Sequence, residues 1–165
     1  MWTKAVMLTQ KQRDKLHADE VVLMADWHTR WQEKHAEYLA FNEDGIVDYE
    51  RWAALPDGKQ ILVLLKETNG LQGSLVECLH HGGNGKTWNN VVRWAEMALD
   101  GVYLENVSQS EFLAIIRNIA VMNLKKYAGG SRAHAKEIER VAHQDADLLR
   151  RQIELYEPDI LLTGG

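Results

Sequence analysis

The stretch Ile61-Leu62-Val63-Leu64-Leu65, followed directly by Lys66-Glu67-Thr68-Asn69-Gly70, decides the fold of this chain. Five consecutive aliphatic residues without polar alternation indicate a strand that is buried on both faces, as in a parallel sheet covered by helices. Two further apolar runs, near 119–125 and 159–163, have the same character. We therefore expect three parallel strands, the first of them at 60–66.

Helical patterns precede and separate these strands. From 10 to 41 the chain has no Pro or Gly, and its apolar residues recur at helical spacings, which indicates one long helix or two short ones. A single long helix is expected from about 133 to 156. Helix and strand alternate after residue 60, which predicts an α/β fold: a three-layer α/β/α domain with a short parallel sheet and the N-terminal helices packed on it. The expected N-caps of the shorter helices are Asp48, Ser74, Thr87 and Ser108.

The length of 165 residues corresponds to about one domain. We divide it into an N-terminal helical part, 1–56, and an α/β core, 57–165. The apolar segments are too short for a membrane helix and the first residues do not resemble a signal peptide, so we expect a cytoplasmic protein with no membrane partner.

Cysteine and histidine usage argues against several kinds of site. The single cysteine, Cys78, cannot form an internal disulfide or supply a cysteine-ligated cluster. His28 and His35 are seven residues apart, but no carboxylate or thiol stands one helical turn from either of them, so we predict no metal site. No cofactor is expected either.

The charge of the chain is unevenly distributed. The total is −5, which repels nucleic acid at long range. Between Arg117 and Arg151, however, eight Lys or Arg stand against four Asp or Glu, a local charge of +4. A polyanion would therefore have to approach one particular face.

Chemistry is expected where the strands end, because parallel sheets place ligand sites beyond the carboxyl ends of their strands. After the first strand, Glu67 would sit at the rim of a partly desolvated cleft, where a carboxylate can act as general base or orient a water. After the second strand, the Asn123 carboxamide can read the edge of a base, and the glycines at 129–130 can receive a phosphate. The alternatives are a solvated loop acid and an asparagine that merely ends a strand.

The order of these motifs resembles the uracil-DNA glycosylase superfamily, and is most similar to a bacterial branch whose first loop reads Gly-Glu-Ala-Pro-Gly. The resemblance covers about residues 60 to 165. It rests on the loop 66–70, Asn123 and Lys125 after the second strand, a Gly/Ser turn, and the segment 148–165, in which Gln152-Ile153 precede Pro158-Asp159 and a hydrophobic strand that ends in glycine.

The resemblance implies roles for the matched positions. Glu67 would be the catalytic residue that positions water at the sugar, and Asn123 would pair with the uracil edge; an alignment on Lys125 places Met122 there instead. Trp88, beside Asn89 and Asn90, is the candidate to stack on the flipped base; the alternative is that it is a core residue. The other positions implied are Asn69 and Gly70 for the substrate, and Lys125, Lys126, Ser131 and Arg132 for nucleic acid.

The chain also departs from that family. Asn69 stands where the family has Pro, the cluster cysteines of the bacterial branch are missing, and no His follows His143 to supply a C-terminal His-Pro-Ser-like loop. Two functions are therefore carried forward. One is hydrolysis of the N-glycosidic bond of a damaged base in DNA; the other is a non-catalytic relative that binds nucleic acid, in particular a single strand, or a nucleotide. We also expect either a natural chain that continues past Gly165 or a homodimer that covers the last strand.

Overall fold

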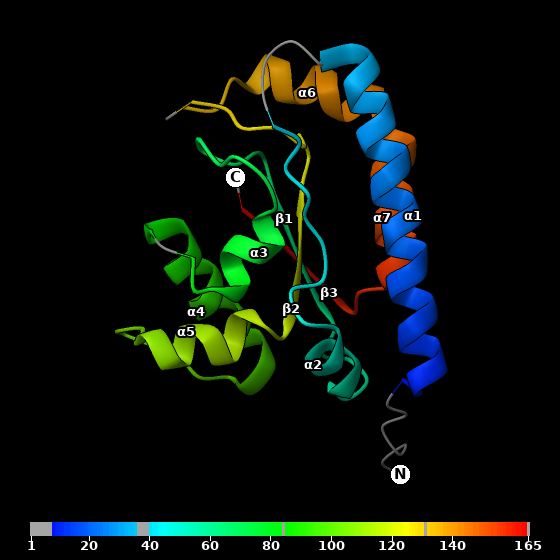
Figure 1. Ribbon diagram of the computed structural model, residues 1–165. Helices are drawn as coiled ribbons and strands as arrows, with labels where there is room; N and C mark the ends of the chain where they lie inside the picture. The colour runs from blue at the N-terminus through cyan, green and yellow to red at the C-terminus, as the bar shows by residue number, and fades with distance from the viewer. Residues whose placement is uncertain (1–7, 36–39, 84, 131, 165) are drawn as a thin grey trace.

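Three parallel strands form the centre of the molecule, as the apolar runs predict (Figure 1). The structure is a computed structural model that describes residues 8–35, 40–83, 85–130 and 132–164. β1 (Ile61–Leu65) lies between β2 (Ile119–Asn123) and β3 (Ile160–Thr163). Both neighbours are parallel to it, and Ile61 pairs with the first residue of each.

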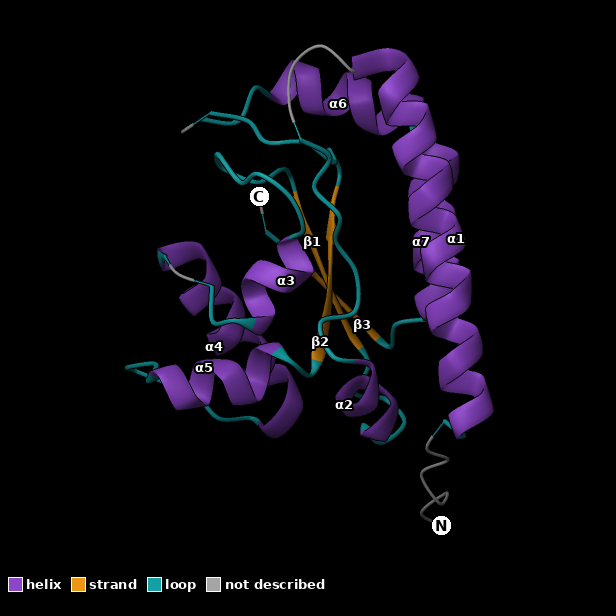
Figure 2. Cartoon of the chain, in the orientation of Figure 1, coloured by secondary structure: helices purple, strands orange, loops and turns teal. Residues whose placement is uncertain are grey.

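Helices cover both faces of this sheet (Figure 2). Ile61 and Val63 pack in one core with α3 (Leu75–His80), α4 (Lys86–Asp100) and α5 (Gln109–Ile116). Leu62 packs in a second core with α1 (Gln10–His35), α2 (Tyr49–Ala54) and α7 (Ala146–Tyr156). Alternate residues of β1 thus face opposite layers, which confirms the predicted three-layer α/β/α arrangement.

Local capping signals set the starts of three helices, α2, α3 and α5. The Asp48 carboxylate accepts from two backbone amides of α2, Ser74 caps α3, and Ser108 with Glu111 forms a reciprocal capping box at α5. The predicted cap at Thr87 is wrong, because α4 already begins at Lys86 after Gly85.

The long C-terminal helix of the prediction is divided in two. α6 (Ala135–Gln144) ends and α7 begins at Asp145, whose backbone leaves the helical region. Its carboxylate lies 3.7 Å from Arg30 and 3.9 Å from Lys34, both on α1. The break thus brings an acidic side chain toward two cations of the neighbouring helix, and such a long-range contact leaves no local pattern in the sequence.

A strap formed by residues 41–47 runs along the free edge of β2. A turn is predicted at 42–45, but the segment is extended and antiparallel to the strand. Val47 N donates to Ile119 O at 3.1 Å, and Val121 N donates to Gly45 O at 2.9 Å. The strap therefore satisfies backbone groups that an edge strand would leave unpaired.

A buried polar cluster joins the strap to the sheet and to α7. The Lys126 ammonium donates to both oxygens of Asp44, at 2.6 and 2.7 Å, and to Gln152 Oε1 at 2.9 Å. It also lies 4.1 Å above the Trp27 ring. Because Lys126 and Asp44 are 2% and 1% exposed, each charge depends on the other for its stability.

Replacing Lys126 with Met is expected to lower the free energy of unfolding by about 3–5 kcal/mol, since Asp44 would remain buried without a cation. The matched control is Arg151→Met, which breaks an exposed pair with Asp26 and is expected to cost about 0–1 kcal/mol. Urea denaturation at pH 7 measures both. Equal losses in the two variants would contradict a core role for the Asp44–Lys126 pair.

Glu20 is expected to make the protein less stable as the pH rises. Burial raises the pKa of Glu20 to about 7; hydrogen bonds from Tyr156 and Ile46 N oppose this, and the charges of Asp44 and Glu43 add to it. The folded protein therefore holds this proton more tightly than the unfolded chain. Stability that is fully present below about pH 4.5 is lost as the pH approaches 7, by roughly 3 kcal/mol.

The Glu20→Gln variant tests this, because the amide does not titrate. The difference in free energy of unfolding between the natural protein and the variant is measured by urea denaturation from pH 4 to pH 8. As the pH rises through that window, the free energy of unfolding of the variant should increase relative to that of the natural protein. Parallel curves would show that the pKa of Glu20 is the same in the folded and the unfolded state.

Candidate functional site

A cavity of about 600 Å³ opens at the carboxyl ends of β1 and β2. Its walls come from the loop after β1, the end of β2, α3 and the start of α4. Five residues proposed from the sequence for catalysis or substrate binding line it together: Glu67, Asn69, Gly70, Trp88 and Asn123. The topology thus brings together positions that are more than 50 residues apart in the chain.

Asn123 is the unusual member of this wall. It is 1% exposed, and its backbone N–H donates to Asp44 at 2.7 Å. Its side-chain Oδ1 and Nδ2 are both buried, and among the described residues neither finds a hydrogen-bond partner. Native proteins seldom leave a buried carboxamide unpaired, because its desolvation costs about 1–3 kcal/mol. The carboxamide could therefore accept one hydrogen bond and donate another to a group that enters the cavity.

The neighbouring residue, Met122, does not compete for this place. It packs with Leu62 and Ala120 in the core on the other face of the sheet. Since side chains alternate along a strand, Asn123 faces the layer that holds the cavity. Of the two residues, Asn123 therefore lines the cavity and Met122 does not.

Glu67 is held in a fixed position at the same cavity. Its side chain is 6% exposed and forms an ion pair with Lys125. Gly129 lies against its carboxylate so closely that a Cβ there would overlap it. The loops that carry these residues are joined by backbone hydrogen bonds, Lys125 N to Lys66 O at 3.0 Å and Gly129 N to Thr68 O at 2.8 Å. The carboxylate is preorganised by the backbone as well as by its charge partner.

Lys125 also contacts a second carboxylate and an aromatic ring. Its ammonium lies 3.4 Å from Glu137 Oε1 and 4.3 Å above the Tyr127 ring. Partial burial raises the pKa of Glu137, but Lys125 and the Tyr127 hydroxyl lower it by more, so the net shift is downward. The lysine therefore compensates two acidic groups at the base of the loop.

The structure corrects the predicted nucleic-acid contacts at Lys125 and Lys126. Both are 2% exposed and paired with carboxylates, so they present no cation to a phosphate at the surface. Arg132 is exposed, and Ser131 lies outside the described residues. The local positive charge read from the sequence therefore overstates the charge on the surface.

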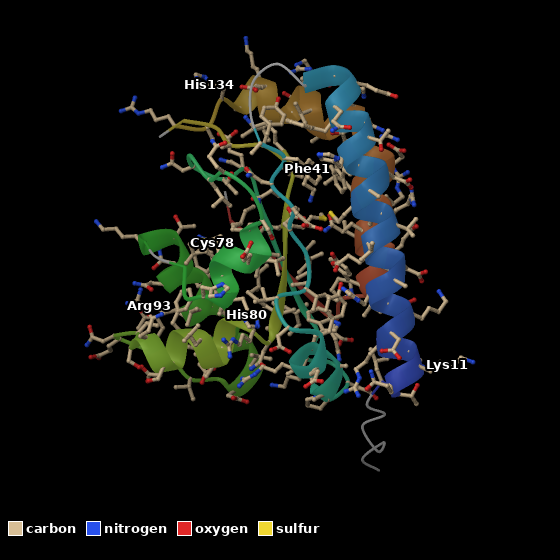
Figure 3. The ribbon with its side chains drawn as sticks, in the orientation of Figure 1. Lys11, Phe41, Cys78, His80, Arg93 and His134 are labelled. Atoms are coloured by element: carbon tan, nitrogen blue, oxygen red, sulfur yellow. The ribbon has the colours of Figure 1, made fainter. Side chains whose placement is uncertain are left out.

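Two residues that the sequence analysis did not assign to a site also shape the cavity. Asn42 is fully buried; its Nδ2 donates to Leu71 O and Gly73 O at 3.0 Å, and its Oδ1 accepts from the Thr68 hydroxyl. Cys78 lines the cavity from α3 and is exposed, although its apolar neighbours suggest a buried thiol (Figure 3). As the only cysteine of the chain, it is a natural reporter of ligand binding.

Comparison with known proteins finds no family model, curated protein or solved structure that matches this chain. Among the described residues, no group of three or more His, Cys, Asp or Glu side chains is placed to hold a metal ion. In that same part of the chain, none of the helices combines the length and apolarity needed to traverse a bilayer. The cavity and the residues that line it are therefore the features that bear on function.

Replacing Asn123 with Leu is expected to raise the free energy of unfolding by about 1–3 kcal/mol without ligand, because it removes an unpaired buried amide at similar volume. The control is Asn42→Leu, which removes a buried amide with three partners and should destabilise by a similar amount. Urea denaturation compares the two. A loss of stability in both variants would mean that the Asn123 carboxamide is satisfied within the protein.

Proposed function

We propose that this chain binds a uracil-like base of DNA in the cavity and hydrolyses its N-glycosidic bond. The observation that carries the proposal is the buried, unpaired carboxamide of Asn123. It supports the resemblance to uracil-DNA glycosylases that the motif order suggests.

The base edge supplies what this carboxamide lacks. Asn123 Nδ2 can donate to a ring carbonyl while Oδ1 accepts from the adjacent ring N–H, a pattern that uracil presents. Trp88, in the same wall, offers an aromatic face for stacking. A base has to leave the duplex stack before it can enter such a cavity, and a single strand presents it at lower cost.

Glu67 is suited to position the attacking water. In the proposed reaction the water oxygen forms a bond to C1′ of the sugar while the C–N bond breaks, and the electron pair of that bond leaves with the base. The water proton passes to the Glu67 carboxylate and then to solvent or the departing base. Lys125 and Gly129 would act as positioning residues, because they hold the carboxylate and are not among the residues that line the cavity.

A second function, base binding without hydrolysis, is favoured by one observation. The Glu67 carboxylate is already engaged in an ion pair with the buried Lys125 ammonium, which competes with a water for its oxygens. In that case the cavity would recognise the same base edge through Asn123 and leave the glycosidic bond intact.

Binding is tested by protection of Cys78. We expect a uracil-containing single-stranded oligonucleotide to slow alkylation of this thiol, since both share the cavity. Asn123→Leu should abolish the protection, whereas Asn106→Leu, an exposed amide elsewhere, should preserve it. An alkylation rate that no uracil-containing ligand changes would overturn the proposed function.

Catalysis is tested on the same oligonucleotide, now carrying an end label. Base release leaves an abasic site, and cleavage of the strand at that site is measured. Glu67→Gln should slow base release by about 10²- to 10⁴-fold while Cys78 protection persists. The exposed Glu105→Gln serves as control. Release that Glu67→Gln leaves unchanged would remove this residue from the mechanism, and protection without any release would establish the binding function instead.

A further inference from the structure

A second hollow, of about 390 Å³, adjoins the cavity at Glu67. Glu67, Thr68 and Asn69 line both spaces. The remaining wall of the second hollow includes Lys66, Asn90, Trp94, Gly130 and Gly164. The carboxylate assigned to catalysis therefore lies on the boundary between two spaces, only one of which the recognised base would occupy.

The position of this hollow in the sheet favours a ligand. The chain passes from β1 to β2 on one side and then crosses to β3 on the other side of β1. The crevice between the carboxyl ends of β1 and β3 is thus the point where the strand order reverses. Open parallel sheets bind ligands at this point. Leu65, Lys66 and Gly164, which end the two strands, line the hollow.

Trp94 gives this hollow an aromatic wall. The residue is 44% exposed, while Val91 and Ala95 on the same helix are fully buried. Asn90 lies one helical turn before it, on the same face of α4, so an amide and an indole face the same space. Gly164 keeps that space open, because a Cβ there would collide with Leu65 and approach the indole of Trp94.

We infer that the second hollow holds the nucleotide next to the recognised one in a single strand, with its base stacked on Trp94. The inference rests on the proposed function and names its substrate class, a single-stranded oligonucleotide rather than a free nucleoside. Two consecutive unstacked nucleotides would fill the two spaces and place the glycosidic bond of the first at Glu67. Stacking of bases on exposed aromatic rings is the general means of binding single strands.

The charges around the hollow agree with this substrate. Lys66 is exposed at its rim and can meet the phosphate that links the two nucleotides, whereas Glu67 is compensated by Lys125. Asn90 and Thr87 add neutral hydrogen-bonding groups. Repulsion of the phosphate by the catalytic carboxylate is thereby reduced.

The test measures Cys78 protection with three ligands: deoxyuridine, a trinucleotide with uracil in the centre, and the same trinucleotide with abasic neighbours. The intact trinucleotide is expected to bind about 10- to 100-fold more tightly than the abasic one, the effect of one stacked base. Trp94→Ala should remove that difference and leave deoxyuridine binding unchanged. Trp94→Phe should retain most of it, and Tyr103→Ala, an exposed aromatic elsewhere, all of it.

The outcomes separate this inference from the proposed function. Equal binding of intact and abasic trinucleotides, with deoxyuridine also bound, would overturn the second subsite and leave the base cavity in place. If none of the three ligands protects Cys78, both fail. A Trp94→Ala variant that changes the oligomeric state in light scattering, without changing trinucleotide binding, would assign Trp94 to a protein contact and overturn the inference.

Discussion

The ion pair between Asp44 and Lys126 constrains the rest of the structure, because its carboxylate contacts three parts of the chain at once. Asp44 belongs to the strap along β2, accepts from the backbone of Asn123, and accepts from Gln152 on α7 at 3.0 Å. A buried charge cannot move away from its partner without a cost of several kcal/mol. The strap, the end of β2 and α7 are therefore fixed relative to one another, and the same carboxylate holds the backbone of Asn123.

This arrangement explains how the protein keeps an unfavourable group in place. Along β2 the polar backbone of Asn123 is satisfied by Asp44, while its carboxamide faces the cavity without a partner. The Glu67 side chain, in contrast, has partners within the protein: Lys125 compensates its charge, and Gly129 leaves room for its carboxylate. Local rules of stability are commonly violated at functional sites and satisfied around them. The contrast between the two side chains supports the proposed roles, in which Asn123 binds the base edge and Glu67 positions the attacking water.

The elements that the sequence predicts well are those governed by local signals. The three aliphatic runs become the three strands, and the caps at Asp48, Ser74 and Ser108 start helices, because neighbouring residues alone decide these features. The strap is missed because Asn-Glu-Asp-Gly has the composition of a turn. Its extended form is held by partners distant in sequence, the backbone of β2 and a lysine 82 residues away. Lys125 and Lys126 are misread for the same reason. Formal charge can be counted along a chain, but burial depends on partners distant in sequence.

These buried lysines bear on how the cavity could recognise a nucleic acid. Of the cations that make the segment from Arg117 to Arg151 basic, two are internal and Arg151 is paired with Asp26. These three do not present a free cation to phosphates, and the chain as a whole is acidic. Binding dominated by phosphate contacts needs clustered surface cations. For the proposed activity, affinity must therefore come mainly from the base itself, through the carboxamide of Asn123 and aromatic faces, and such recognition requires that the base be unstacked before the protein can hold it.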